Sequence, residues 1–307
     1  MKQVSVCITV LLLFALTAWA YSPATTGFQF LKTQVGARPA AMAGAFVAIS
    51  GDVSALHYNP AGIAVFSQRV AGFTYTNDLL DFSSGFIGYV QPQVGKGNLG
   101  LSILYKDYGD FTKKDQNGED MGTFGAGSIA LNGSYAMQIA PNLSIGVTGK
   151  YIRASIDNYS ADAVAMDAGV LYYIAKHELT IAAGIYNLGT ATSAFITTKD
   201  DLPMNLRIGA SKKLAHLPLL VSGNAYKYSD EDLQFALGGE FTLSDYMLFR
   251  LGYDSIGKKM HVDSSDDTMA GMALGFGFLW KQFKIDYSFT SYGALGSLNR
   301  FTISGHF

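Results

Sequence analysis

AGMALGFGFLW at residues 270–280 and FKIDYSFT at residues 283–290 both alternate a large apolar side chain with a small or polar one. A β-strand places successive side chains on opposite faces, so each segment has one apolar face and one small or polar face. Only Lys281 and Gln282 separate the two segments. The pattern predicts two antiparallel strands joined by a tight turn.

The same alternation continues back through most of the chain. It predicts fourteen strands of roughly the 9–11 residues that cross a membrane when tilted, although twelve or sixteen remain open because strand ends are hard to locate. The candidates are 70–77, 83–91, 98–106, 125–138, 143–156, 162–174, 179–188, 203–213, 217–228, 233–241, 247–254, 270–280, 283–290 and 301–307.

The composition indicates a membrane protein in which every second side chain of a strand contacts lipid. Charged residues make up 15% of the chain, against about 25% in soluble domains. There are 34 Gly, 18 Tyr and 20 Phe. After the N-terminus no run of about 18 apolar residues occurs, which excludes helical spans. We expect an all-β fold, a transmembrane antiparallel β-barrel, because closure leaves no unpaired edge in lipid. A large periplasmic β-sandwich is the alternative, but it has one buried face per sheet.

The predicted connections differ in length on the two sides of the barrel, although the asymmetry is partial because three loops on the outer side are short. The turns expected on the periplasmic side are all short: 91–97, 139–142, 175–178, 214–216, 243–246 and 281–282. The long connections, 107–124, 189–202 and 255–267, all fall on the other side. Outer-membrane barrels have short periplasmic turns and longer extracellular loops. The asymmetry therefore predicts a periplasmic Phe307.

The first twenty residues read as a signal peptide. Lys2 is followed by an apolar segment from Val4 to Leu16, and Ala18-Trp-Ala20 is a small-x-small cleavage pattern before Tyr21. The only cysteine, Cys7, lies inside this leader, so the mature chain has no thiol chemistry. Export and the strand pattern together predict the outer membrane of a double-membraned bacterium. The expected domains are a signal peptide (1–20), an N-terminal plug (21–69) and a barrel (70–307).

Residues 27–69 lack the alternation. Pro39 suits the first turn of a helix, and 40–48 is rich in small helix formers. Asp52 could cap a second short helix over 53–58, which Pro60 would end. Small residues allow close packing, so we favour a helical plug in the lumen over an arm beneath the barrel.

This segment carries a motif, Gly36-Ala-Arg-Pro followed by Ala-Met-Ala-Gly-Ala, Asp52 and Asn59-Pro-Ala-Gly62. It resembles the start of the PorV/PorQ family, which is related to outer-membrane long-chain fatty-acid transporter barrels. The resemblance implies a fourteen-stranded barrel with a plugged lumen. Its motif residues are Gly36, Arg38, Pro39, Gly44, Asp52, Asn59, Pro60 and Gly62. Fatty-acid transporters pass apolar substrates, whereas PorV-type members accompany type IX secretion.

Seven charged residues lie on the face opposite the apolar rows: Lys150, Asp167, Arg207, Glu240, Arg250, Lys284 and Asp286. Folding adjacent strands together brings Lys150 near Asp167 and Glu240 near Arg250, where opposite charges offset each other's desolvation. They could join plug to wall or form a polar gate. At the C-terminus, Phe301, Ile303 and Phe307 resemble the signal that barrel-insertion machinery reads.

Catalytic patterns are missing. The histidines, His57, His177, His216, His261 and His306, have no metal-ligand spacing. No G-x-S-x-G elbow occurs. Residues 263–267 could hold a cation weakly, but a solvated loop is the simpler interpretation. We expect no enzyme, although a phospholipase barrel is an alternative, no cofactor, and no nucleic-acid partner at a net charge of −2.

Three functions are therefore open. The first is a barrel that passes or binds hydrophobic small molecules. The second is a type IX secretion-associated protein that binds cargo or translocon. The third is a structural barrel without transport. The expected partners are outer-membrane lipid, the barrel-insertion machinery, and a hydrophobic ligand or secretion-system proteins.

Overall fold

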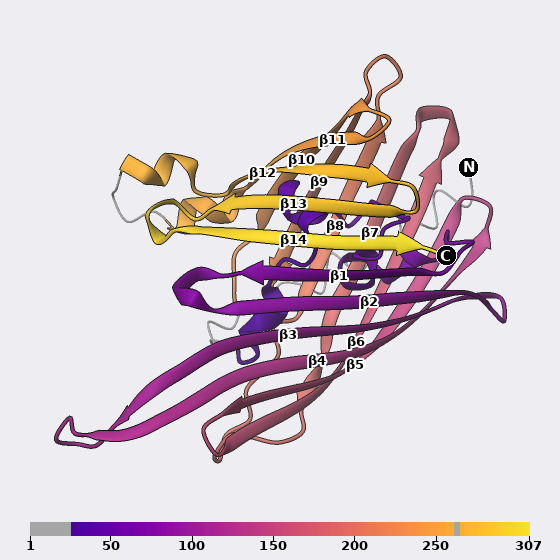
Figure 1. Ribbon diagram of the computed structural model, residues 1–307. Coiled ribbons are helices and arrows are strands. Elements are labelled where there is room, and N and C mark those ends of the chain that lie inside the picture. Colours follow the sequence, from indigo (N-terminus) through magenta and orange to yellow (C-terminus); the bar gives the residue numbers. More distant parts are fainter. Residues whose placement is uncertain (1–25, 261–264) are drawn as a thin grey trace.

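The computed structural model describes residues 26–260 and 265–307. These residues form one closed barrel of fourteen antiparallel strands (Figure 1), so the fold predicted from the sequence is confirmed. The signal peptide, His261 and the start of the 263–267 loop lie outside the described residues. The strands are β1 (Val70–Asn77), β2 (Ser83–Val94), β3 (Gly97–Lys114), β4 (Asp120–Ala140), β5 (Leu143–Ile156), β6 (Tyr159–Ile174), β7 (Leu179–Ala191), β8 (Asn205–Lys213), β9 (Leu219–Tyr228), β10 (Gln234–Ser244), β11 (Met247–Asp254), β12 (Met272–Trp280), β13 (Phe283–Ser291) and β14 (Ser297–His306).

The barrel closes between its first and last strands. β1 pairs with β14 in an unbroken register from Val70 opposite His306 to Asn77 opposite Asn299. Every other strand pairs with its neighbour in sequence. Because lipid offers the backbone no hydrogen bonds, this closure satisfies groups that an open edge would leave unpaired.

The two faces of each strand meet different surroundings. On β12, Phe276 faces outward and is 46% exposed, whereas Ala273 faces inward and is 4% exposed. The phenylalanine, methionine and leucine rows found in the sequence therefore contact lipid. The small and polar rows face the lumen. Among the described helices, none is long and apolar enough to span a membrane.

The connections are unequal at the two ends of the barrel. Turns such as 141–142 and 281–282 are tight, and at the other end 192–204 and 255–271 are long. By the usual asymmetry of such barrels, the long connections face the outside and Phe307 the periplasm.

One predicted loop is wrong. Residues 107–124 are largely strand, because β3 and β4 stay paired out to Lys114 opposite Asp120, and the hairpin projects far from the barrel (Figure 1). A bulge with Gly109 at φ +69° interrupts the ladder, and Phe111 stacks on Phe124 with ring centroids 5.5 Å apart. Cross-strand aromatic pairs stabilise such an extension.

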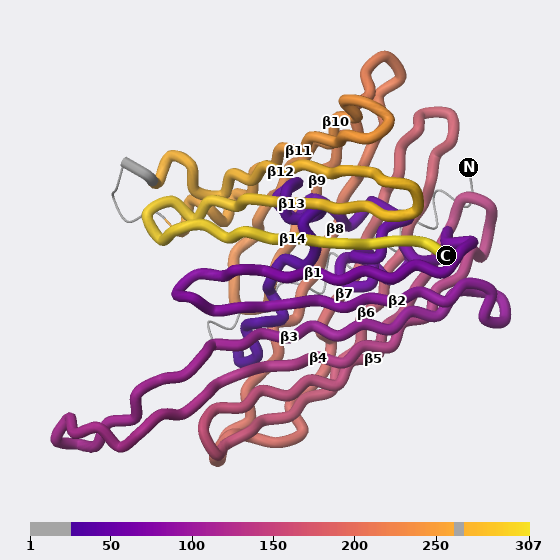
Figure 2. Tube along the Cα trace, in the orientation of Figure 1, coloured from indigo at the N-terminus to yellow at the C-terminus, as the bar shows by residue number. Residues whose placement is uncertain are grey.

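The N-terminal segment folds into four short helical turns inside the barrel, seen as indigo tube in Figure 2. They are η1 (Gln29–Lys32), α2 (Ala37–Ala41), α3 (Ala55–Tyr58) and η2 (Pro60–Ile63); the remaining short turns are η3 (Leu79–Asp81), η4 (Ala175–His177), η5 (Ser255–Met260), η6 (Ser265–Met269) and η7 (Gly293–Leu295). We refer to residues 26–66 as the plug.

The helix predicted over 40–48 is wrong, whereas the shorter second helix is close to its expected range. α2 ends at Ala41, because Ala43 and Gly44 take left-handed conformations with φ of 54° and 77°. The Gly44 amide donates back to the Pro39 carbonyl, which closes the helix end in the usual way. α3 ends just before Pro60.

Glycines on the inner face of the wall make room for the plug. A Cβ added at Gly252 would meet the backbone of Met42 and Ala43. The wall glycines in close contact with the plug are Gly72, Gly88, Gly100, Gly146, Gly169, Gly209, Gly238, Gly252 and Gly275. Such contacts on nine strands mean that the plug fills the lumen and does not lie beneath it.

We predict that Gly252→Ala destabilises the folded barrel by about 1–3 kcal/mol, the usual cost of overpacking a filled core. Urea unfolding of the protein in lipid vesicles measures the change. Gly149→Ala is the matched control, since a Cβ at that outward glycine meets no atom within 4 Å. Equal stabilities of the two variants would contradict a tightly packed plug.

Candidate functional site

Six charged side chains close into a ring where the plug meets the wall. Arg38 and Asp52 come from the plug, and the other four come from β10, β11 and β13. In order, the contacts are Arg38–Glu240 (2.7 Å), Glu240–Arg250 (2.6 Å), Arg250–Asp286 (2.8 Å), Asp286–Lys284 (3.2 Å), Lys284–Asp52 (3.4 Å) and Asp52–Arg38 (3.1 Å). We call these six residues the charge ring.

The charge ring is electrically balanced and largely buried. Three cations alternate with three carboxylates, so each carboxylate pairs with two cations. The Arg250 side chain is fully buried. Buried charges are tolerated only when they are well paired, and removing one member leaves its neighbours uncompensated. The ring therefore binds the plug to three strands.

The sequence located part of the ring. It predicted the Glu240–Arg250 pair, which lies directly across the β10–β11 hairpin, and the inward direction of Lys284 and Asp286. It did not predict that Arg38 and Asp52 of the motif complete the ring. Burial raises the pKa of Asp52, but Lys284 and Arg38 outweigh burial and hold this pKa well below its usual range.

Lys150 and Asp167 form a separate pair, 2.7 Å apart, as the sequence predicted. The pair is tied to β7, because the Asp167 carboxylate accepts from the Asn187 amide and Lys150 donates to the Asn187 side chain. Asn187 itself has a φ of 56°, which is uncommon outside glycine. This cluster holds a bulge where two residues of β7 face Asp167.

Arg207 lies apart from both groups, although the sequence grouped it with them. It is half-buried, and within the described residues its guanidinium has no ion pair. Four tyrosine rings surround it, with centroids 5.1–5.9 Å from its central carbon: Tyr58, Tyr186, Tyr226 and Tyr228. One guanidinium nitrogen donates to the Tyr228 hydroxyl at 3.0 Å.

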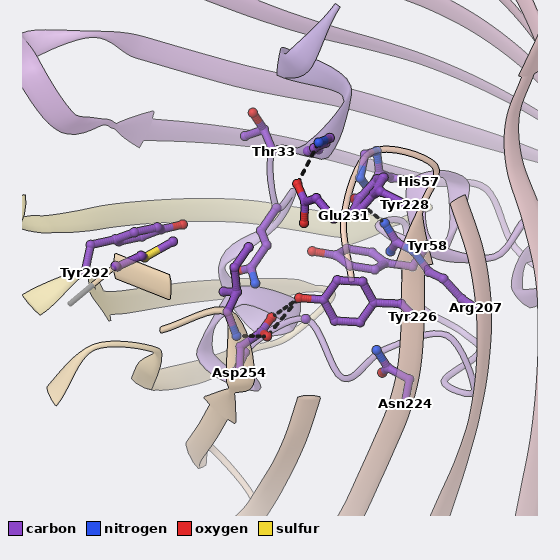
Figure 3. A pocket seen from close by; sticks show the side chains of 16 residues that line it. Thr33, His57, Tyr58, Arg207, Asn224, Tyr226, Tyr228, Glu231, Asp254 and Tyr292 are labelled. Carbon is purple, nitrogen blue, oxygen red and sulfur yellow. Dashed lines mark hydrogen bonds and ion pairs between the residues drawn. The ribbon is translucent and has the colours of Figure 1, made fainter. Parts of the chain in front are cut away.

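A cavity of about 80 Å³ adjoins Arg207 (Figure 3). Its walls come from the plug, from β8 and β9, and from the outer loops that hold Glu231, Ile256 and Tyr292. His57 of the plug also lines it. Burial, with Lys150 and Arg207 nearby, keeps the pKa of His57 well below its usual range.

The other motif residues shape the plug. Gly36 has φ +80° beside Ser54, and a Cβ at Gly62 would press on Ala55. Asn59 donates to the Val47 and Val170 carbonyls and accepts from the Ala61 amide, while Pro60 begins η2. These four residues hold chain turns in place and do not line the cavity, whereas the motif residue Gly44 does.

A contact that the sequence did not predict anchors the plug at its outer end. The Asp230 carboxylate, in the β9–β10 loop, accepts from Thr26, Gln29 and Lys32, and Lys32 also pairs with Glu231 at 2.6 Å. We call these five residues the outer latch. Only the acidic run at 230–232 marks it in the sequence.

The predicted insertion-signal residues lie on the outer face of the barrel. Phe301, Ile303 and Phe307 all point outward and are more than half exposed. Phe307 stacks on Tyr89 and donates its amide to the Arg69 carbonyl. In the described part of the chain, no three His, Cys, Asp or Glu residues are arranged to hold a metal. Asp267, from the acidic run, packs against Gly293.

An apolar outer surface, a closed ring of strands and a filled lumen define an outer-membrane β-barrel. Residues 20–211 match the family model described as type IX secretion system protein PorV. The chain belongs to this family, as its motif indicated. A search of curated proteins finds no match.

Solved barrels share the fold. A FadL homologue from Pseudomonas aeruginosa has a TM-score of 0.61 at 14% identity, over 90% of this chain and 98% of that one. The toluene transporter TodX from Pseudomonas putida has a TM-score of 0.59 at 13% identity, over 89% of this chain and 98% of that one.

We predict that Arg250→Ala loosens the plug, because removing one member of a buried ion pair destabilises a folded protein by about 3–5 kcal/mol. Single-channel recording in planar bilayers should then show higher conductance than the unaltered protein. Lys113→Ala, which removes an exposed pair with Asp157, is the control and should leave conductance unchanged. Unchanged conductance in Arg250→Ala would argue against the charge ring as the closure.

We predict that Asp230→Asn speeds amide hydrogen exchange in residues 26–32 at pH 7. Burial raises the pKa of Asp230, but hydrogen bonds from Lys32, Thr26 and Gln29 outweigh it and lower the pKa to about 2. The unfolded value is about 3.9, so the latch is at full strength above about pH 4 and is lost as the pH falls towards 2.

Asp232→Asn, in the same loop, is the control, since the Asp232 side chain is 77% exposed. It should leave exchange in residues 26–32 unchanged. Equal exchange in both variants would mean that the latch does not hold the plug.

Proposed function

We propose that this barrel binds small hydrophobic molecules beneath its outer loops and passes them sideways into the membrane. The observation that carries this proposal is an incomplete seam in the wall. β7 pairs with β6 as far as Ala191, but with β8 only as far as Tyr186 opposite Asn205. Beyond that point, β7 has a strand partner on one side only.

The seam is closed by side chains and a loop. The Asn187 side chain donates to the Pro203 carbonyl at 3.0 Å, and Phe195 and Leu202 of the 192–204 loop pack inward against the core. Such contacts open at lower cost than a continuous ladder, because fewer hydrogen bonds break. Leu188, next to the seam, is 53% exposed and faces lipid.

The alternative route along the barrel axis is blocked. The plug fills the lumen, and opening it would require breaking the buried charge ring. A sideways route requires neither displacement of the plug nor disruption of the charge ring. It also delivers an apolar molecule directly into the lipid.

The related structures support this proposal through their common fold. TodX carries the description toluene transporter, and a variant of it is described as a monoaromatic hydrocarbon channel. In this proposal the barrel has no catalytic role and uses no cofactor, and β14 is the strand that the insertion machinery reads.

A second candidate function is favoured by the family match. Members described as type IX secretion proteins would meet secretion components at the outer membrane. The long β3–β4 hairpin, exposed through most of 107–124, offers a surface for a translocon component or cargo. Affinity purification from native membranes, with a variant lacking residues 109–123 as control, should recover a secretion component only with the complete hairpin.

We predict that a disulfide across the seam slows hydrophobic transfer. The variant carries Asn187→Cys and Pro203→Cys, at positions that already touch. Uptake of labelled toluene into vesicles should fall at least about fivefold on oxidation, since the seam can no longer widen. Dithiothreitol should restore it in the same protein. Equal uptake in both states, with the disulfide verified by mass spectrometry, would contradict the sideways route.

A further inference from the structure

We propose that the cavity beside Arg207 is a binding site for a small organic monocarboxylate, an inference that rests on the proposed entry of small molecules beneath the outer loops. Figure 3 shows Arg207 and the tyrosines converging from the wall, with His57 and Tyr58 contributed by the plug. The proposal depends on three features: an unpaired guanidinium, unpartnered polar atoms around it, and the charge balance of the lining.

Within the described residues Arg207 has no carboxylate partner, unlike the cations of the charge ring. Its Nε is buried without a hydrogen-bond partner, and one terminal nitrogen donates to the Tyr228 hydroxyl. Guanidinium groups bind carboxylates through two parallel N–H donors. The tyrosine faces stabilise the cation, and the second terminal nitrogen has no hydrogen bond to the described residues, so it is available to a planar anion in the cavity.

Other polar atoms near Arg207 also lack partners. The Tyr186 hydroxyl, both side-chain polar atoms of Asn205 and the Oδ1 atom of Asn224 are buried and unpartnered. Asn205 lies two residues from Arg207 on β8, and Tyr186 is directly opposite Asn205 on β7. Buried polar groups are normally hydrogen-bonded. Asn224 lines the cavity, whereas Tyr186 and Asn205 lie beside Arg207 in the wall and do not line it. The unpartnered atoms therefore leave Arg207 without a protein acceptor on this side.

The lining charges select for a single negative charge. Lys32 and Arg207 balance Glu231 and Asp254. Both carboxylates are already engaged: Glu231 by Lys32 and Gln234, and Asp254 by the Tyr226 hydroxyl and the Ile256 amide. They leave Arg207 free, but they repel a second negative charge. A monocarboxylate is therefore favoured over a dianion such as a dicarboxylate or phosphate.

The volume limits the part of the ligand that can enter. A cavity of about 80 Å³ exceeds the roughly 10–15 Å³ that one water needs and falls short of the roughly 150 Å³ that holds benzene. A carboxylate with one or two carbons fits as the protein stands. Any longer body would extend outward past Ile256 and Met260, which line the outer side.

Isothermal titration of the full-length mature protein in detergent tests this assignment with three probes. Propionate is the monoanion, propionamide its uncharged counterpart of the same shape, and malonate the dianion. We expect propionate to bind at least about tenfold more tightly than either of the others, as for a charge-assisted hydrogen bond. Equal affinity for propionate and propionamide would overturn the proposal, and so would tighter binding of malonate.

Variants connect the binding to Arg207. Arg207→Gln should weaken propionate at least about tenfold, and Tyr228→Phe should weaken it less, because it removes only a hydroxyl that lines the cavity beside Arg207. Arg153→Gln is the control, because Arg153 lies on the outward face of β5 beside Asp162. Heat-modified gel migration verifies folding. If Arg207→Gln fails to fold, Tyr228→Phe still decides: propionate affinity unchanged there would overturn the site.

The outcome is separable from the proposed function. If toluene uptake depends on the seam while propionate does not bind, the carboxylate site is wrong and the sideways route stands. If propionate binds through Arg207 while the seam disulfide has no effect on uptake, the carboxylate site stands and the sideways route is wrong.

Discussion

The charge ring is the interaction on which the rest of this structure depends. Its side chains are at most 17% exposed, and each carboxylate pairs with two cations and each cation with two carboxylates. Two of the six residues belong to the plug and four to the wall. The four wall residues are two carboxylates and two cations, and the plug adds one of each. Without the plug, Glu240 would lose its contact with Arg38 and Lys284 its contact with Asp52. Each of these two wall charges therefore keeps both of its partners only when the plug is in place.

Shape complements charge in the same region. Wall glycines accept the plug so closely that an added methyl group at Gly252 would strike backbone. The lumen is consequently a packed core, as rigid as the interior of a soluble protein. Whatever the barrel does must use its less constrained parts. These are the outer loops, the seam between β7 and β8, and the cavity beneath them.

The sequence predicted the parts of this arrangement that depend on periodicity. Alternation located all fourteen strands and the inward charges, and the tight β10–β11 turn placed Glu240 opposite Arg250. It failed where contacts join distant segments: Arg38 meets Glu240 across 202 residues of chain. It also failed where local backbone overrides propensity, as at the left-handed Ala43, and where a ladder continues beyond the membrane, as in β3 and β4.

Arg207 and Arg250 illustrate how one residue type serves two purposes within the same lumen. Arg250 contacts two carboxylates. Separating it from either one would leave a buried charge unpaired, so its role is structural. Arg207 is stabilised by aromatic faces, which soften the cost of burial and leave its planar donors incompletely used. A cation already paired with two carboxylates has little attraction left for an anionic ligand. Arg207 has no ion pair within the described residues and adjoins a cavity, so it gains from binding an anion, and this difference separates the structural charges from the proposed site.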